Sequence, residues 1–260
     1  MHTTDIGYAT ADAVVIRGQD FSTEILGKCD FVDMILLTAV GRRPTAQEKV
    51  MINMILVMAA GHGVTPSVLS ARLTYLGAPE ALQGAVAAGM LGGGSVYLGP
   101  TQNIAQSLID ACRQLDATAS DAEVRQLAAG YIEAAKAAKK PVLGIGSGTH
   151  VDGDPRTSVI RQLSRDNGFY GLHWRLMDAV ADVLSENKGR RFVANGAGAM
   201  GAAIADMQLD PLLGRGLMLT GRCASLVAHI LEERDRPIGQ AVWDLVLEHE
   251  AHAQAGHVAA

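Results

Sequence analysis

The sequence predicts an all-α protein. Over most of the chain, apolar residues recur at three- and four-residue spacing, as on one face of a helix, and polar Gly-rich breaks separate these segments. Strands do not alternate with helices, so a parallel α/β sheet is not expected. The pattern predicts roughly ten helices. We place them at residues 31–39, 45–61, 67–75, 79–90, 101–115, 120–139, 158–167, 171–187, 199–207, 211–231 and 241–252.

The N-terminal part begins with weak strand signals and then turns helical. Residues 13–16 and 22–26 look like short strands, which form a small hairpin at most. Thr45 and Glu48 have the spacing of a capping box, in which each side chain accepts from the other residue's backbone N–H. A helix therefore starts there, and residues 61–67, GHGVTPS, break it before the next one.

Proline and glycine mark the next boundaries. Pro79 suits the first turn of a helix that we expect to end in the glycine run at residues 92–94. Pro100 stands at the start of the following helix in the same way. Ser120 and Glu123 form a second capping box, which opens the helix at residues 120–139.

Residues 143–156, LGIGSGTHVDGDPR, form a Gly-rich loop between two predicted helices. Glycines let backbone come close to a ligand and turn N–H groups toward an anion. His150 adds a titratable group and Arg156 a fixed cation. The loop is not a phosphate loop of the GxxxxGK(S/T) kind, because no Lys follows its glycines, and it is not a dinucleotide fingerprint opening a helix after a strand.

Beyond this loop the pattern stays helical. The segment Asn195-Gly196-Ala197-Gly198 precedes a helix rich in small residues, and residues 211–231 form a long apolar helix. Residues 237–239, PIG, form a turn before the last helix.

Composition excludes several classes of protein. The 260 residues are 48% hydrophobic and 19% charged, enough for a large core in one domain or two joined ones. A net charge of -5 without a basic block argues against a nucleic-acid partner. Three scattered cysteines form neither a disulfide framework nor a metal-ligand set, so we expect no metal and a cytoplasmic location. Neither a signal peptide nor a membrane span is expected.

Several motifs, in order along the chain, resemble segments of the citrate synthase family. Residues 61–67 with Ala71-Arg72 resemble the family's DHGxxxSxxxAR segment, and residues 85–89, AVAAG, resemble its AVAAGI. The Gly-rich loop resembles GxGHxxxxxxDPR. Residues 221–229, GRCASLVAH, resemble RxxGxxAH, with Ser225 in place of the glycine.

This resemblance covers about residues 31–236, and the short chain looks like the citryl-CoA lyase branch of the family. It implies an all-α, citrate-synthase-like multi-helical fold with a large helical domain, residues 1–100 and 214–260, and a small one, residues 101–213. It also implies a site in the inter-domain cleft and a homodimer or higher homo-oligomer.

The resemblance further implies an enzyme that makes or breaks a carbon–carbon bond next to an acyl-CoA thioester. His62 falls at a substrate-binding histidine, and Arg156 and Arg222 fall at arginines that grip substrate carboxylates. The guanidinium fork matches a carboxylate bidentately. The structural alternatives are that His62 caps a helix break and that the arginines pair with Asp154 or Glu232. The coenzyme A end is expected on the backbone of Leu143, Gly144, Ile145 and Gly146.

The departures from the family pattern concern its catalytic positions. Tyr97 stands where the family's GPxHGG has histidine, Ser147 replaces the histidine of GxGH, and Ala197 replaces the acidic residue of NVD. His150 matches a second histidine that some lyase-type members carry. Enolisation by an aspartate base therefore does not carry over to this chain.

Each candidate catalytic residue also has a structural interpretation. His150 handles the hydroxyl proton or is a solvated loop residue. Tyr97 donates to an oxyanion or packs. Asn195 donates a hydrogen bond or caps a helix, and Ser147 contacts substrate or shapes the loop.

We therefore expect an acyl-CoA carbon–carbon lyase. It would cleave a citryl-CoA-like 3-hydroxyacyl-CoA to acetyl-CoA and an oxo acid, or catalyse the reverse condensation. A different acyl-CoA is an alternative within this class. The alternative from another class is a non-catalytic acyl-CoA-binding or partner subunit. Ser147 and Ala197 favour it, and the retained residues oppose it, namely His62, His150, Arg156 and Arg222.

Overall fold

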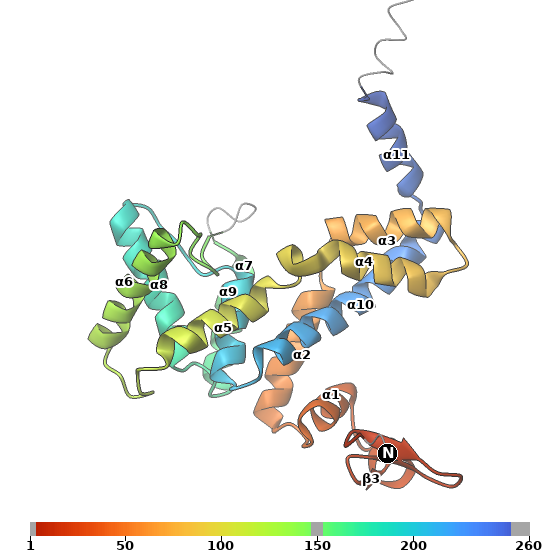
Figure 1. The fold of residues 1–260 in the computed structure, drawn as a ribbon, viewed down its shortest axis with the longest axis horizontal. Helices are drawn as coiled ribbons and strands as arrows, with labels where there is room; N and C mark the ends of the chain where they lie inside the picture. The colour runs from red at the N-terminus through yellow and green to blue at the C-terminus, as the bar shows by residue number, and fades with distance from the viewer. Residues whose placement is uncertain (1–3, 147–152, 251–260) are drawn as a thin grey trace, which may run out of the picture. The chain divides into compact units, whose positions relative to one another are not determined.

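The computed structural model describes residues 4–146 and 153–250, and these residues are mainly helical. Eleven α-helices occur in these two stretches (Figure 1). They are α1 (Phe31–Val40), α2 (Ala46–Ala60), α3 (Pro66–Gly77), α4 (Leu82–Tyr97), α5 (Pro100–Cys112), α6 (Asp121–Ala137), α7 (Pro155–Asp166), α8 (Leu172–Lys188), α9 (Gly196–Asp206), α10 (Pro211–Asp235) and α11 (Gly239–Glu248). None of these helices combines the length and the hydropathy needed to cross a membrane.

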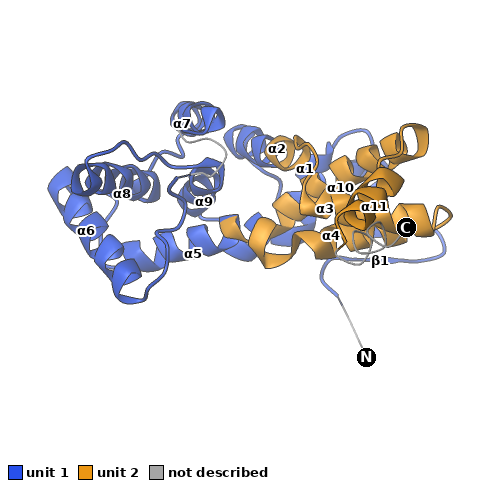
Figure 2. Cartoon of the chain, turned by 90° about the horizontal axis from the view of Figure 1, so that it is seen from above, with its two compact units in different colours: residues 1–55, 101–214 blue, residues 56–100, 215–260 orange. Residues whose placement is uncertain are grey.

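The chain divides into two compact units. Unit 1 contains residues 1–55 and 101–214, and unit 2 contains residues 56–100 and 215–260 (Figure 2). Helices α2 and α10 have residues in both units. The large and small domains derived from the family resemblance, and the cleft between them, stay predictions.

The N-terminal segment of unit 1 forms a small antiparallel sheet in the order β1-β2-β3, from Gly7–Ala9, Val14–Ile16 and Gln19–Asp20. The prediction of a strand at residues 22–26 is wrong, because Phe21–Ile25 is a π-helical turn. Asp20 explains the difference. Its carboxylate accepts the Thr23 N–H at 2.7 Å, so a helical turn is capped where a strand at residues 22–26 was expected.

Both predicted capping boxes are present. The backbone N–H of Glu48 donates to Thr45 Oγ1 at 3.1 Å, and the backbone N–H of Thr45 donates to Glu48 Oε2 at 2.7 Å. Ser120 and Glu123 form the same pair of bonds at the start of α6. Arg42 also donates to both carboxylate oxygens of Glu48, at 2.6 and 2.8 Å. This contact, more than the helix cap, lowers the pKa of Glu48 to about 2.

The core of unit 1 lies among its longer helices. Helix α8 packs against α6 and α9, and α7 packs against α9. Trp174 of α8 is fully buried, and its indole N–H donates to the Ser164 hydroxyl of α7 at 3.0 Å. This core fixes the first turns of α7 and α9, which carry Arg156 and Asn195.

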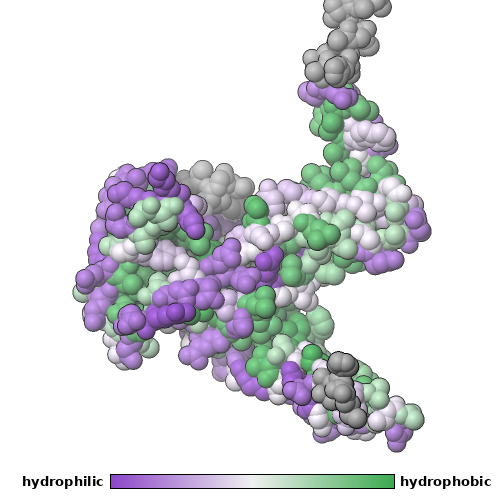
Figure 3. Space-filling model, viewed as in Figure 1, coloured by the Kyte–Doolittle hydropathy of each residue, from purple (hydrophilic) through white to green (hydrophobic). Residues whose placement is uncertain are grey.

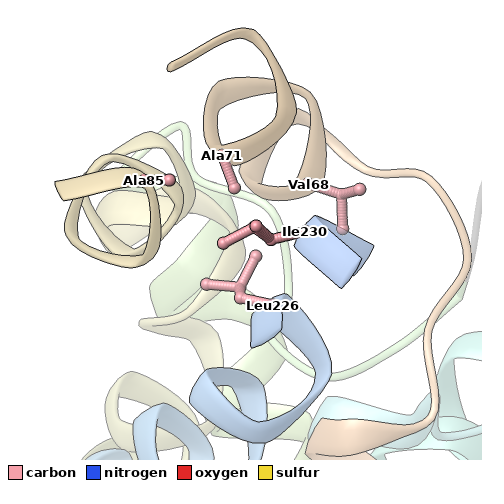
Figure 4. Packing of buried hydrophobic residues seen from close by; sticks show 5 residues of the cluster. All are labelled: Val68, Ala71, Ala85, Leu226 and Ile230. Atoms are coloured by element: carbon pink, nitrogen blue, oxygen red, sulfur yellow. The ribbon is translucent and has the colours of Figure 1, made fainter. Parts of the chain in front are cut away.

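The core of unit 2 is built where α3, α4 and the later part of α10 meet. Figure 4 shows Val68 and Ala71 of α3, Ala85 of α4, and Leu226 and Ile230 of α10 converging in one cluster. All five are essentially inaccessible to solvent. The cluster holds the face of α10 that continues into Arg222 and His229.

The helical geometry of α4 breaks at Gly94, so the prediction that a helix ends in the glycine run at residues 92–94 is confirmed. Helix α4 begins at Leu82, beyond Pro79, and its range to Tyr97 contains two helical segments joined by a kink at Gly94 (φ 50°, ψ -153°). A Cβ on Gly92 would lie 2.7 Å from the Ser70 Cβ of α3. The run therefore permits close packing of α4 on α3, a tertiary requirement that local sequence does not reveal.

Candidate functional site

His62 lies in a bend of unit 2 between α2 and α3. Helix α2 ends at Ala60, and α3 begins after Thr65, whose hydroxyl accepts the Val68 N–H. A pocket of about 530 Å³ lies beside this bend, and its lining includes His62, Ser225 and His229. Ser225 and His229 come from α10, on the helix face that Arg222 shares by its three- and four-residue spacing.

Arg222 is the most unusual polar residue of unit 2. It is only 4% exposed, and its Nε and Nη1 are buried without a hydrogen-bond partner among the described residues. Burial lowers the pKa of the guanidinium, which nevertheless stays charged at neutral pH. Among the described residues Glu232 pairs with Arg72 and Arg236, and the structural alternative, a pair between Arg222 and Glu232, is not formed. A carboxylate ligand would supply the acceptors that Arg222 lacks.

An ionic network that the sequence analysis did not identify reaches the pocket through Glu232. Arg72 is 3% exposed and donates to Glu232 and, at 3.0 Å, to Glu233. Burial alone would raise the pKa of Glu233, but N–H groups of Ile238 and Gly239, together with Arg72, outweigh it and lower that pKa. The signal was present in the sequence, since polar residues 222, 225, 229 and 232–233 recur on one face of a long apolar helix.

Arg156 lies in unit 1, at the start of α7. Its Nε and Nη2 donate to the two carboxylate oxygens of Asp154 at 2.8 and 2.7 Å, as the structural alternative predicted. Asp154 also accepts the backbone N–H of Arg156 and, at 3.1 Å, that of Gly196 in α9. Contact with Arg156, above all, lowers the pKa of Asp154 to about 2. The Arg156 side chain is still 39% exposed, so one edge of the fork remains accessible to a ligand.

Asn195 caps α9 and ties it to the Gly-rich loop. Its Oδ1 accepts the Gly198 N–H at 2.9 Å, and its Nδ2 donates to the Gly146 carbonyl at 2.7 Å. Both ends of the amide are thus used, so the capping role that sequence analysis left open is confirmed. The loop backbone adds bonds from Asn195 N to Gly144 O and from Gly146 N to Val193 O.

Two glycines allow this close crossing of backbone. Gly144 has φ +78°, and a Cβ on Gly198 would lie 2.3 Å from the Gly144 carbonyl oxygen. Leu143, at the start of the crossing, lines a separate, mainly apolar pocket of about 440 Å³ with Tyr131 and Lys140. The loop thus brings backbone, one apolar pocket and one cation together within unit 1.

The other predicted residues have less defined surroundings. Tyr97, in unit 2, is 57% exposed at the end of α4, on the short turn that follows the break at Gly94. Ser147 and His150 lie outside the described residues. Across residues 4–146 and 153–250, no group of three or more His, Cys, Asp or Glu side chains is arranged to hold a metal ion.

Comparison with known families places these features in context. Residues 9–241 match the model of the citrate synthase C-terminal domain. The citryl-CoA lyase of Hydrogenobacter thermophilus has a similar structure, with a TM-score of 0.77 and 31% identity over 90% of this chain and 87% of that one. No curated protein matches in a sequence search.

More distant structures share the fold. ATP citrate lyase from Methanothrix soehngenii, solved with citrate and coenzyme A, has a TM-score of 0.73 and 18% identity over 90% of this chain and 39% of that one. Citrate synthase from Thermoplasma acidophilum, solved with carboxymethyl coenzyme A and oxaloacetate, has a TM-score of 0.58 and 17% identity over 80% of this chain and 54% of that one. The predicted all-α, citrate-synthase-like fold is confirmed.

Proposed function

Because the chain belongs to the citrate synthase family, we propose that it is a carbon–carbon lyase acting on a citryl-CoA-like 3-hydroxyacyl-CoA. The observation that carries this proposal is Arg222, a buried guanidinium with two unpaired nitrogens. Such a charge is costly to bury, and a substrate carboxylate would compensate it. Similarity to a citryl-CoA lyase over most of both chains supports the reaction class.

The reaction is a retro-aldol cleavage of Claisen type. The substrate hydroxyl gives its proton to a base, and the bond between the hydroxyl-bearing carbon and the thioester α-carbon breaks. The hydroxyl-bearing carbon becomes the carbonyl of an oxo acid. The electron pair forms a thioester enolate, which takes a proton at its α-carbon and leaves as acetyl-CoA. The same steps in reverse give condensation, so the protein would accelerate both directions.

Each candidate side chain is assigned a step or a substrate group that matches its chemistry. We assign the substrate carboxylates to Arg222 and to the free edge of Arg156, with His62 as a further substrate contact. We assign the hydroxyl proton to His150 and a substrate contact to Ser147. The exposed phenol of Tyr97 would donate to the enolate oxygen.

Asn195 fits a positioning role better than contact with an oxyanion. Its Oδ1 is bound to the Gly198 N–H and its Nδ2 to the Gly146 carbonyl. Contact with substrate would require breaking one of these bonds. We therefore propose that Asn195 holds the loop in place.

We propose that coenzyme A binds along Leu143, Gly144, Ile145 and Gly146. The adjoining apolar pocket suits the uncharged part of the molecule, and Lys140 on its wall suits a phosphate. The three free thiols fit a reducing compartment, so we also propose a cytoplasmic location.

The test is direct. Purified protein is incubated with citryl-CoA and related 3-hydroxyacyl-CoAs, and acetyl-CoA release is followed. Turnover is expected with wild type, loss of turnover with His150→Ala, and unchanged turnover with His249→Ala as the matched control. Tight coenzyme A binding without turnover on any substrate would overturn the lyase and favour the non-catalytic acyl-CoA-binding subunit, which Ser147 and Ala197 at altered catalytic positions make the second candidate.

A further inference from the structure

The imidazole of His229 connects α10 to the bend that carries His62. Its Nε2 lies 3.0 Å from the His62 carbonyl oxygen, and its Nδ1 lies 3.3 Å from Nη2 of Arg72. The His229 side chain is 14% exposed and lines the same pocket as His62. All three residues belong to unit 2, so this contact lies within one compact part of the chain.

The neighbours of His229 determine which ring nitrogen carries the proton. A guanidinium only donates hydrogen bonds, so Nδ1 must accept from Arg72. The proton is then on Nε2, which donates to the His62 carbonyl. Glu232 is the other charged group nearby, with Oε2 3.9 Å from Nδ1, and it is already bound to Arg72.

Arg72 is itself held firmly. Glu233, whose side chain is 2% exposed, accepts from Arg72 at 3.0 Å and also from the N–H of Gly239 at 2.7 Å. The guanidinium therefore has a fixed orientation before any ligand binds. A chain of hydrogen bonds runs from Glu233 through Arg72 and His229 to the backbone of the bend.

The bend is flanked by glycines, and the His229 bond ties it to α10. Gly61 and Gly63 flank His62, and glycine gives a backbone more conformational freedom than any other residue. Among its own neighbours, the bend has the bond from His62 N–H to Ala60 O at 3.0 Å. The bond from His229 fixes the carbonyl on the other side of the same residue.

We propose that His229 is a positioning residue, which orients His62 toward the substrate through the His62 carbonyl and is itself oriented by Arg72. This inference rests on the substrate-binding role proposed for His62. It assigns a function to a histidine that is not among the candidate site residues of the sequence analysis. It also explains why a charged pair at Arg72 and Glu233 is buried beside the pocket.

A double-mutant cycle tests the proposal. His229→Leu should raise the KM for citryl-CoA about tenfold and change kcat less, because one orienting hydrogen bond is lost. His229→Gln should keep most of the wild-type KM, since an amide has both an acceptor and a donor. In a His62→Ala background, His229→Leu should change KM less than about twofold, because the residue it acts through is gone.

A purely structural histidine gives a different pattern. His229→Leu would then multiply the KM of the His62→Ala variant by the same factor as in wild type, with an equal fall in melting temperature, and His229→Gln would give no rescue. That result would overturn the proposal.

A measurement without turnover separates this inference from the proposed reaction. Imidazole ¹⁵N NMR spectra of the intact protein should place the His229 proton on Nε2. His229→Leu, but not His229→Gln, should shift the His62 ring signals. A proton on Nδ1, or unchanged His62 signals, would overturn the positioning role even in an active enzyme. If the spectra are as expected but the protein is inactive toward all tested thioesters, only the proposed reaction is overturned, and the positioning role stands.

Discussion

At the scale of single residues, Arg222 is expected to favour substrate binding at the expense of the stability of the free protein. An arginine with buried nitrogens lacking acceptors gives up hydration without full compensation in the free protein. Arg72, by contrast, is equally buried but has Glu232 and Glu233 as partners. The difference between these two arginines of unit 2 argues that Arg222 is placed to meet a ligand, whereas Arg72 is placed to hold neighbouring protein groups, His229 among them.

Arg222→Met should therefore stabilise the protein and destroy substrate binding. Removing an unpaired buried charge should raise the free energy of unfolding by about 1–3 kcal/mol. Losing a buried carboxylate partner should raise KM by roughly two orders of magnitude. Urea unfolding and steady-state kinetics measure the two effects, with Arg222→Lys as the variant that keeps charge but loses the fork. A less stable Arg222→Met protein would mean that Arg222 serves the fold.

How much of the site the sequence predicts depends on where each residue's partners lie. Arg156 and Asp154 are two residues apart in the sequence, so their ion pair could be predicted from local sequence. The partners of Arg72 lie about 160 residues away, at Glu232 and Glu233, and no local pattern links them. The roles of His150 and Ser147 stay predictions.

At the scale of elements, the start of α9 controls the Gly-rich loop. Asn195 joins the two through one amide, capping Gly198 with its oxygen and holding Gly146 with its nitrogen. Asn195→Asp keeps the cap but sets a carboxylate against the Gly146 carbonyl. We expect this substitution to lower the free energy of unfolding by about 1–2 kcal/mol, which urea unfolding measures. It should also weaken coenzyme A binding, which calorimetry measures. Tight coenzyme A binding by Asn195→Asp would mean that the loop does not hold coenzyme A.

Glycines in this crossing should be intolerant of a side chain, whereas Gly130, a helical glycine with open space around it, should tolerate one. A Cβ on Gly198 would meet the Gly144 carbonyl at 2.3 Å, and backbone on both sides cannot yield easily. Gly198→Ala should lower the free energy of unfolding by several kcal/mol, as an overpacking substitution in a protein core does. Gly130→Ala, in α6 with no atom within 4 Å of the new Cβ, should stabilise by about 0.5–1 kcal/mol. Thermal unfolding of both variants checks the contrast, and equal effects would contradict it.

Element types were predicted well where the signal is local and poorly where packing decides. The capping boxes at Thr45 and Ser120 gave correct helix starts because both partners lie within four residues. The glycine run correctly predicted a helix end, at Gly94, but the contact between α4 and α3 that Gly92 permits could not be predicted, because the sequence alone does not place these helices together. The turn at Phe21–Ile25 was missed because its cap, Asp20, resembles an ordinary turn residue.

At the scale of the whole molecule, α11 carries exposed apolar side chains. This ten-residue helix packs against α3, yet Trp243, Leu245 and Val246 are 55%, 56% and 61% exposed. Figure 3 shows apolar surface along it. So short a helix is marginal without a partner for its apolar side chains. The dimer expected from the family resemblance would supply that partner.

We propose that a second copy of the chain covers α11. Trp243→Glu should then convert a dimer to a monomer, because a carboxylate cannot be buried in an apolar interface without a partner. Light scattering measures the mass. Val159→Glu, at an equally exposed apolar residue of α7 in unit 1, is the matched control and should leave the mass unchanged. A monomeric wild type at micromolar concentration would exclude the proposal.

Acid should destabilise the whole protein through its paired carboxylates. Asp154 and Glu48 have pKa values lowered to about 2, from ordinary values of 3.8 and 4.5, and the pKa of Glu233 is lowered as well. Above pH 4.5 these groups are charged in the folded and unfolded chain alike, and their pairs contribute fully. As the pH falls from there toward 2, the unfolded chain binds protons first, so the free energy of unfolding falls, by roughly 2 kcal/mol for each of the first two groups. Urea unfolding between pH 7 and 3 measures this loss.

The Asp154→Asn variant is the control. Its free energy of unfolding should be lower than that of wild type at pH 7 and should fall less on acidification. If its curve ran parallel to that of wild type, the Asp154–Arg156 pair would carry none of the acid sensitivity, and the anchor between α7 and α9 would depend on other contacts, such as the Thr157 hydroxyl bond to Ala194 O at 3.0 Å.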